Sequence, residues 1–267
     1  MTLPGYEQIV RGWSPDLRRR FPEERFHFVR ETRSTNDDLL QRLRKGQGAH
    51  LDLIQADFQT GGRGRRGDKW EAPAGSNLLF SVALRLPDDR AIWTRLPHLT
   101  ATIAGRAVES ILPGEKVIEA KWPNDLMVGG KKLAGILVET VMVPEPFAVV
   151  GIGLNVNMRT ADLPGELRGI ATSLYDCLGC ESSRSFLLGL IVQGFIREYP
   201  EGLSNFEPVR AWMEQRNFLK GKEVGVTSSS ETVSGTVLGL GAGGELLLNV
   251  SGEGLKTVIS AEKIVIC

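Results

Sequence analysis

The sequence predicts an α+β protein in which a mixed sheet with helices is followed by a small C-terminal β-barrel. Between residues 26 and 216, segments with the alternation of strands are interspersed with segments that have helical apolar spacing. After Phe218 the chain changes to short alternating segments separated by turn residues, which is typical of a small barrel. These two textures predict two folded units.

Composition excludes several classes of protein. The chain has 267 residues, with 32 Lys and Arg against 32 Asp and Glu, so its whole surface is not a polyanion-binding field. It has no apolar run of about 18 residues and no basic segment followed by an apolar run, so we expect neither a membrane span nor a signal peptide. Three cysteines are not a secreted disulfide framework. We therefore expect a cytoplasmic protein.

The element pattern predicts where each strand and helix lies. FHFVRE from Phe26 alternates like a strand, and Ser34 to Asn36 supply N-cap residues for a helix that ends at Gly46. Gly129-Gly130 is the turn type that joins two strands of a hairpin. The further expected strands are 51–59, 76–86, 117–122, 125–143 and 148–157, the further helices 99–111, 183–199 and 206–216, and a loop covers 159–173. The expected divisions are an N-terminal extension over 1–29, a larger domain over 30–217 and the small barrel over 218–267.

The glycine-rich segment QTGGRGRRGDKW at 59–70 is the first candidate site. Gly62, Gly64 and Gly67 match the dinucleotide pattern G-x-G-x-x-G, but that pattern requires a helix directly afterwards, and a strand follows here instead. What remains is a mobile backbone carrying Arg63, Arg65 and Arg66. Guanidinium groups suit carboxylate and phosphate oxygens, although such a loop can also be only a solvated basic hairpin.

The second candidate site is the segment KWPND at 121–125 together with Lys132. Lys132 begins a strand that is apolar further along, and small residues, Ala134 and Gly135, follow it. Such a lysine usually extends to solvent, but small neighbours are also what a site needs when a ligand lies against the backbone. Two cationic groups of residues, with an amide and a carboxylate, fit a reaction that brings two anions together, because such a reaction needs positive charge held between them.

Five motifs in one order resemble biotin–protein ligases of the short form, without an N-terminal DNA-binding domain. They are STN at 34–36, QTGGRGRRGDKW at 59–70, KWPND at 121–125, GKKLAGILVE at 130–139 and GIGLNVN at 151–157. The resemblance implies a catalytic domain similar to class II aminoacyl-tRNA synthetases, with a mixed sheet and helices on one face. It also implies an ATP-dependent biotin–[acetyl-CoA-carboxylase] ligase that forms biotinyl-5′-AMP and transfers biotin to a lysine of a biotin carboxyl carrier protein. The cofactors would be biotin as substrate, ATP and Mg²⁺.

The resemblance also assigns residues by motif position. The implied catalytic residues are Lys132, Arg65, Asp125 and Lys121, and Asp125 is also the implied metal ligand. The implied biotin-binding residues are Ser34, Thr35, Asn36, Gln59, Arg63, Gly64, Arg65, Lys132 and Gly135. The implied nucleotide-binding residues are Arg63, Arg65, Trp70, Lys121, Asn124, Lys132 and Asn155, with Gly153 beside them.

Two departures and one absence modify these expectations. Asp68 stands where some relatives have a basic residue, and Gly61 replaces the more usual alanine, which should leave the loop freer. Only about 30 residues precede the catalytic domain, about half of what a winged helix needs, so we expect no DNA binding. The resemblance is compatible with a homodimer that assembles through a sheet edge.

Other functions stay open as alternatives. A lipoate or octanoate ligase or transferase has a related fold, although GRGRRG with KWPND favours biotin. A nucleic-acid-binding module would use the basic loop, but no aromatic residue follows Phe218 to stack on bases. Cys177 and Cys180 form a C-x-x-C pair without enough further ligands for zinc, so we expect them to be structural or incidental.

Overall fold

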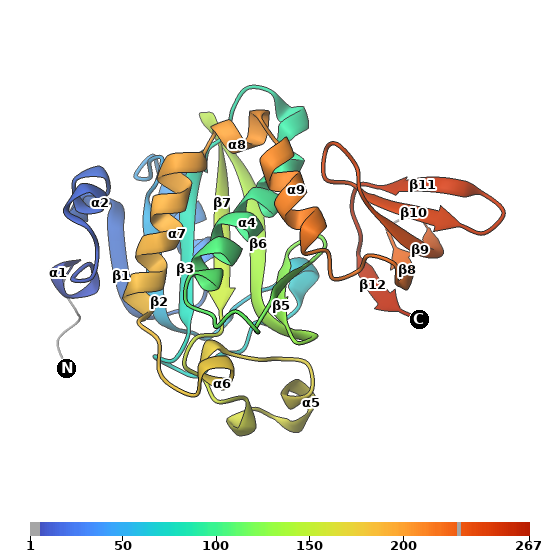
Figure 1. Cartoon of the computed structure of the whole chain (residues 1–267). Helices are drawn as coiled ribbons and strands as arrows, with labels where there is room; N and C mark the ends of the chain where they lie inside the picture. Colours follow the sequence, from blue (N-terminus) through green and yellow to red (C-terminus); the bar gives the residue numbers. More distant parts are fainter. Residues whose placement is uncertain (1–5, 229–230) are drawn as a thin grey trace.

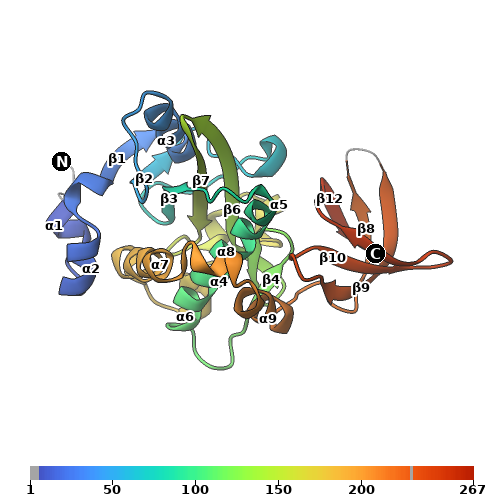
Figure 2. The ribbon, with the colours of Figure 1, turned by 90° about the horizontal axis from the view of Figure 1, so that it is seen from above.

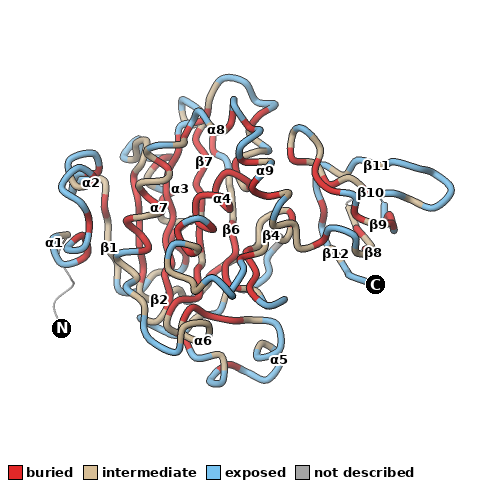
Figure 3. Tube along the Cα trace, in the orientation of Figure 1, coloured by how far each residue is buried: buried red, intermediate tan, exposed pale blue. Residues whose placement is uncertain are grey.

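The computed structural model describes residues 6–228 and 231–267, and it confirms an α+β fold with two sheets. Figure 1 shows a larger sheet covered by helices and a smaller sheet formed by the C-terminal part of the chain. Figure 3 shows that the buried positions concentrate in the strands of the larger sheet and the helices against it. The core of the protein therefore lies between this sheet and its helices.

The larger sheet is mixed and has seven strands in the order β1-β2-β3-β7-β6-β5-β4. Strands β1 and β2 pair in parallel, and all other neighbours pair antiparallel. The strands are β1 Phe26–Thr32, β2 Leu53–Gln59, β3 Leu78–Arg85, β4 Ile118–Lys121, β5 Asp125–Val128, β6 Lys131–Val143 and β7 Glu145–Leu154. Each expected strand of this region is present.

Helices cover both faces of the sheet, which corrects the expectation that they lie on one face. On one face, α4 (Leu96–Glu109) packs against α7 (Arg184–Glu198) and α9 (Glu207–Gln215), while α3 (Thr35–Arg44) packs on β2, β3, β6 and β7. Figure 2 shows α3 on the opposite side of the strands from α4 and α7. Alternation along the strands separates the two cores: in β7, Ala148 and Val150 join the large cluster, whereas Phe147 and Val149 join the small cluster under α3.

Local signals account for two of the boundaries that place the site. The Ser34 side chain accepts a hydrogen bond from the backbone N–H of Asp37, so α3 begins with the expected N-cap. Gly129 and Gly130 have φ values of 58° and 75°, which only a residue without Cβ adopts at little cost, and they form the expected turn between β5 and β6.

The N-terminal segment shares the core of the larger sheet. It contains α1 (Tyr6–Ile9) and α2 (Pro15–Arg20), and residues 1–5 of the expected extension lie outside the described residues. Trp13 is buried, and its indole N–H donates to the Ser185 carbonyl at 2.8 Å. Strand β1 begins at Phe26, so the expected division at residue 29 falls inside a strand. The extension therefore packs as part of the larger unit.

The C-terminal unit is the expected small β domain. Its antiparallel sheet has the order β11-β10-β9-β8-β12. The strands are β8 Glu223–Thr227, β9 Thr232–Leu240, β10 Leu246–Val250, β11 Gly254–Val258 and β12 Lys263–Ile266. The unit is docked on the larger unit, because the Trp122 indole N–H donates to the Gly244 carbonyl at 2.9 Å and a Glu214 carboxylate accepts from the Leu240 N–H at 3.0 Å.

Short helices complete the chain. These are α5 Gly165–Arg168, α6 Leu174–Leu178 and α8 Glu201–Ser204. The expected loop over 159–173 therefore contains one short α-helix, and it also contains a 3-10 turn at Thr160–Asp162. Over the described ranges, none of the helices is both long and apolar enough to cross a membrane.

Candidate active site

One cavity lies at the N-terminal end of α3, above the middle strands of the larger sheet. It is walled by α3, the loop that follows β2, the turn between β4 and β5, the glycines of β6 and β7, and residues 261–264 of the C-terminal domain. The space between its walls is about 1040 Å³, part of which is open to solvent at the mouth.

Nearly all residues that the resemblance assigns line this cavity. They are Ser34, Thr35, Asn36, Gln59, Arg63, Gly64, Arg65, Trp70, Lys121, Asn124, Asp125, Lys132, Gly135 and Gly153. Asn155 is absent from the lining. Segments that are more than 100 residues apart in the chain therefore meet around a single space.

Glycines form the floor of the cavity because side chains there would occupy it. A Cβ at Gly153 would lie 2.4 Å from the Trp70 ring, and one at Gly135 would lie 2.8 Å from the same ring. A Cβ at Gly151 would lie 2.3 Å from the Asn36 side-chain oxygen. The interior glycines of β6 and β7 thus mark a place where other groups approach the backbone closely.

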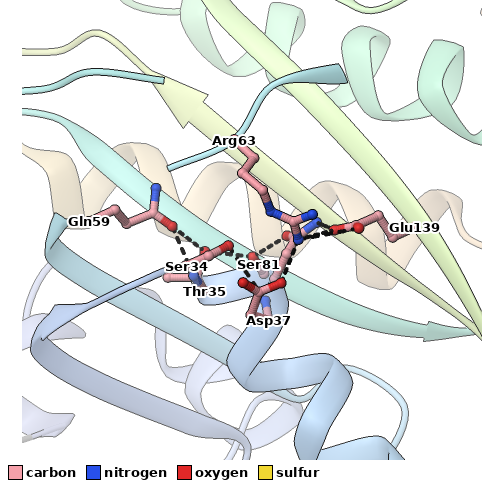
Figure 4. A network of polar contacts seen from close by, with 8 residues as sticks. Ser34, Thr35, Asp37, Gln59, Arg63, Ser81 and Glu139 are labelled. Atoms are coloured by element: carbon pink, nitrogen blue, oxygen red, sulfur yellow. Dashed lines mark hydrogen bonds and ion pairs between the residues drawn. The ribbon is translucent and has the colours of Figure 1, made fainter. Parts of the chain in front are cut away.

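One end of the cavity carries uncharged polar groups. The Thr35 backbone N–H donates to Gln59 Oε1 at 2.8 Å, and the Thr35 and Ser81 hydroxyls are 2.6 Å apart. Ser81 donates to Asn36 Oδ1 at 2.5 Å. Figure 4 shows these side chains converging from α3, β2 and β3. Hydrogen-bond donors and hydrogen-bond acceptors are therefore both held in fixed positions at this end.

Arg63 lines the cavity, but its guanidinium is held by carboxylates. It ion-pairs with Asp37 on α3, and with Glu139 on β6 at 3.2 Å (Figure 4). Arg63 therefore fastens the start of the loop to α3 and to β6. The rest of the loop is a small hairpin, in which the backbones of Arg63 and Lys69 form an antiparallel β-bridge and the Trp70 N–H donates to the Gly62 carbonyl at 2.9 Å.

The other end of the cavity contains an ammonium group beside a carboxylate. Lys132 Nζ lies 2.7 Å from Asp125 Oδ1, and it lies 5.6 Å from the centre of the Trp70 ring. The Asn124 side-chain amide donates to the Ile136 carbonyl at 2.7 Å, which holds the turn before β5 against β6. This end therefore offers a positive charge that is paired with a carboxylate.

Asn155 lies behind Lys132, outside the cavity. Its side chain is buried, and the amide donates to the Thr172 carbonyl at 3.0 Å and to the Lys132 carbonyl at 3.4 Å. The Lys132 N–H donates to the Ile170 carbonyl, and the Thr172 N–H donates to the Lys132 carbonyl. In this structure Asn155 thus supports the backbone of Lys132, which differs from the expected position beside a nucleotide.

The C-terminal domain contributes a wall of the cavity. Arg65 Nη2 donates to the Ala261 carbonyl at 2.9 Å, and residues 261–264 line the space. The side chain of Arg66 lies outside the described part of the chain. The loop and the C-terminal domain therefore meet over the cavity.

The charge of the cavity differs from the neutral balance of the whole chain. Among the described lining residues the basic ones are Arg63, Arg65, Lys69, Lys121, Lys132 and Lys263, and the acidic ones are Asp68, Asp125 and Glu262. Arg63 is offset by Asp37 and Glu139 outside the lining, so the positive charge that favours anionic groups comes from the other basic residues.

Three contributors were missed by the sequence analysis: Ser81, the side chain of Glu139 and residues 261–264. Ser81 carried a signal, because it is a polar residue inside an otherwise apolar strand, and such residues are usually hydrogen-bonded when buried. Glu139 is the last residue of the motif GKKLAGILVE at 130–139, and the resemblance assigned it no role. Nothing in the sequence predicted that residues 261–264 return to the cavity.

The C-x-x-C pair lies away from this site. Cys177 and Cys180 are free thiols, and no group of three or more side chains suited to a metal ion is found within residues 6–228 and 231–267.

The fold and the cavity together define a class of protein: an α+β domain with a cavity under a glycine-rich loop. Comparison with known proteins identifies the class more closely. Residues 28–157 match the model of the biotin/lipoate A/B protein ligase family. The bifunctional ligase/repressor BirA of Escherichia coli is 32% identical over 227 residues, which cover 82% of this chain and 67% of that protein. The chain belongs to the biotin/lipoate A/B protein ligase family.

Two further similarities concern named ligases. The biotin–[acetyl-CoA-carboxylase] ligase of Mycobacterium tuberculosis is 42% identical over 154 residues, which cover 55% of this chain and 54% of that protein. The biotin protein ligase of Aquifex aeolicus in complex with biotin and ATP has a TM-score of 0.79 and 28% identity, covering 91% of this chain and 99% of that chain. The chain spans about two thirds (65%) of the bifunctional ligase/repressors of two Bacillus strains.

Proposed function

We propose that this chain is an ATP-dependent ligase that activates biotin as biotinyl-5′-AMP and transfers it to a lysine of a biotin carboxyl carrier protein. One observation carries the proposal: a single cavity has an uncharged hydrogen-bonding end at Thr35 and Gln59 and a cationic end at Lys132. Biotin has the matching chemistry, because it joins a neutral cyclic urea to a carboxylate by a flexible chain.

In the first step, a biotin carboxylate oxygen attacks the α-phosphorus of ATP. The new bond joins that oxygen to phosphorus, the bond to the β-phosphate oxygen breaks, and pyrophosphate leaves. Two anions must approach one another, so positive charge held in advance between them lowers the barrier. Lys132 supplies that charge, and it is ion-paired with Asp125 at 2.7 Å.

In the second step, an acceptor lysine amine attacks the carbonyl carbon of the mixed anhydride. An amide bond forms, the bond from the carbonyl carbon to the phosphate oxygen breaks, AMP leaves, and the amine loses a proton. The mixed anhydride is prone to hydrolysis, so the enzyme must exclude water until the acceptor arrives. The glycine-rich loop serves this purpose, and its contact from Arg65 to the Ala261 carbonyl at 2.9 Å closes it against the C-terminal domain.

Magnesium fits this site as an ion that arrives with ATP. Mg²⁺ is usually held by one or two carboxylates together with phosphate oxygens. Asp125 supplies a carboxylate in the cavity, and it would hold the ion there in competition with Lys132. When bound, the ion would neutralise phosphate charge.

The partner and the surroundings are also proposals. The acceptor is a carrier domain of acetyl-CoA carboxylase or of a similar enzyme, and the proposed compartment is the cytoplasm. Homodimer formation and the lack of DNA binding stay predictions.

A comparison of acid substrates tests the proposal. Biotin-dependent exchange of pyrophosphate into ATP, measured beside lipoate and octanoate, should be observed with biotin alone. Lipoate and octanoate have no ring N–H or ring carbonyl, so they would leave the buried polar groups of the cavity without partners, which costs affinity. Exchange with lipoate or octanoate but not with biotin would refute the proposal in favour of the related ligases.

A further inference from the structure

A continuous chain of polar side chains links Glu139 to the uncharged end of the cavity (Figure 4). Glu139 Oε2 accepts from Asn36 Nδ2 at 2.8 Å, and Asn36 Oδ1 accepts from Ser81 at 2.5 Å. Ser81 in turn lies 2.6 Å from the Thr35 hydroxyl. Asn36, Ser81 and Thr35 are all at least 97% buried, since their exposed fractions are 3%, 0% and 3%. Water therefore has little access to this chain.

The charge of Glu139 sets the direction of every bond in this chain. A carboxylate can only accept, so Asn36 must turn its NH₂ group towards Glu139 and its oxygen towards Ser81. Ser81 has a single hydrogen, and Asn36 Oδ1 receives it. The 2.6 Å contact between Ser81 and Thr35 therefore requires the Thr35 hydrogen. The other acceptor within reach of that hydrogen, Gln59 Oε1, is farther away at 3.1 Å.

The consequence is a defined pattern at the cavity. With its hydrogen directed to Ser81, the Thr35 oxygen offers a lone pair to a ligand N–H. Gln59 Oε1 accepts from the Thr35 backbone N–H at 2.8 Å, which orients the amide and leaves its NH₂ group to donate. The end of the cavity thus offers an acceptor beside a donor, which matches a ring that carries an N–H group beside a carbonyl.

Arg63 keeps Glu139 in place. Its guanidinium lies 3.2 Å from Glu139 Oε2 and also ion-pairs with Asp37. Neither carboxylate lines the cavity, so neither is positioned to touch a ligand there. Glu139 can therefore reach a ligand only through the neighbours that it contacts: through Asn36, which is bonded to Ser81, or through Arg63, which itself lines the cavity. The first route is the one that ends at the uncharged polar groups.

We propose that Glu139 is a positioning residue for recognition of a cyclic urea, acting through Asn36 and Ser81 to hold the Thr35 and Gln59 groups in the required directions. This inference rests on the proposed function, and it adds residues outside the cavity that determine which ring chemistry is accepted.

The test compares Glu139→Gln with Glu145→Gln in biotin-dependent pyrophosphate exchange. The amide introduced by Glu139→Gln can donate as well as accept, so Asn36 is no longer forced into a single orientation. Glu145 is the matched control, because it lies on the same hairpin in an exposed ion pair with Arg85. We expect KM for biotin to rise at least about tenfold in Glu139→Gln, with kcat and KM for ATP within about twofold of wild type. Glu145→Gln should match wild type.

A rescue variant tests the path. In Asn36→Asp/Glu139→Gln the charged acceptor moves to position 36, where it again faces Ser81, so KM for biotin should return to within about threefold of wild type. Failure of this rescue would overturn the route through Asn36. Ser81→Ala breaks the chain at its middle and should raise KM for biotin in the same way. It replaces Glu139→Gln if that variant does not fold.

The outcomes separate the inference from the proposed function. A wild-type protein without biotin-dependent exchange refutes the proposed function. A wild-type protein that turns over biotin, with Glu139→Gln indistinguishable from Glu145→Gln, refutes only the role of Glu139. An equal rise of KM for biotin and for ATP would also overturn it, because a positioning role at the urea end does not extend to the nucleotide.

Discussion

Replacement of Lys132 by methionine removes one positive charge from the cavity while it keeps a side-chain stem of similar length. Two unit charges about 4 Å apart interact by about 4 kcal/mol at an effective dielectric constant of about 20. The Lys132 side chain is 38% exposed, and Asp125 offsets part of its charge, so solvent screening reduces this value. We expect a loss of about 2 to 4 kcal/mol of transition-state stabilisation, which corresponds to a decrease of about 30- to 1000-fold in kcat/KM.

The assay is biotin-dependent pyrophosphate exchange, and the matched control is Lys131→Met. Lys131 is the preceding residue on β6 and is exposed, so its charge lies near the site without lining the cavity. In Lys132→Met, Asp125 is left without its ammonium partner and repels the incoming anions. The double variant Asp125→Asn/Lys132→Met should therefore recover part of the lost rate. A Lys132→Met protein whose kcat/KM is within about threefold of Lys131→Met would refute the role of this charge.

The remaining predictions concern the loop, the cavity floor and the domain interface. Arg65→Ala removes the bond to the Ala261 carbonyl and should release biotinyl-5′-AMP into solution about five- to tenfold faster, as measured by rapid filtration. Gly153→Ala places a Cβ 2.4 Å from the Trp70 ring and should displace the indole. Because Trp70 is an implied nucleotide-binding residue, we expect KM for ATP to rise by about fivefold or more and the tryptophan fluorescence to shift. Burial lowers the pKa of His98 from 6.5 to about 4, so the unfolded chain binds this proton more tightly. The contribution of His98 to the free energy of unfolding is complete above about pH 6.5 and decreases towards pH 4, by at most about 1.4 kcal/mol per pH unit. His98→Gln should remove that slope in urea denaturation.

Each of these predictions has a control and a contrary outcome. Arg19→Ala removes an exposed arginine distant from the loop, and equal release from it and Arg65→Ala would contradict the closing role. Gly114→Ala adds a Cβ with nothing within 4 Å. An effect as large as that of Gly153→Ala would show that the effect does not come from contact with the Trp70 ring. If the free energy of unfolding of His98→Gln still decreases between about pH 6.5 and about pH 4 as in the wild type, the acid sensitivity belongs to other groups.

Sequence patterns predicted most of the elements because they depend on local chemistry. The cap at Ser34 needs only a side-chain oxygen near the first free N–H groups of α3, and the turn at Gly129-Gly130 needs only two residues that tolerate positive φ. These requirements act over a few residues and are therefore visible in the chain. Local chemistry does not determine on which face of the sheet α3 packs. The same helical pattern suits either face of the sheet, and only the alternation of the strands under it decides.

The candidate site shows the same division. Lys132 was recognised from the sequence because a lysine is unusual at the start of an apolar strand. The loop was recognised because arginines are interspersed with its glycines. The partners of Arg63 were not, because Asp37 lies 26 positions before it and Glu139 lies 76 positions after it, and charge alone does not select among acidic residues. The different place of Asn155 has the same cause: an amide serves a ligand or a backbone carbonyl equally well, and only its surroundings determine which.

By itself, the sequence determined the α+β class, the order of most elements and the residue types that can meet a carboxylate and a phosphate. Tertiary structure alone decided that residues 261–264 wall the cavity, that Arg63 is turned towards Asp37 and Glu139, and that Ser81 connects Glu139 to Thr35. The physical reason is distance along the chain. Contacts between remote segments depend on how the sheet stacks its strands and docks the C-terminal domain, and hydrogen-bond directions exist only once those segments are packed together.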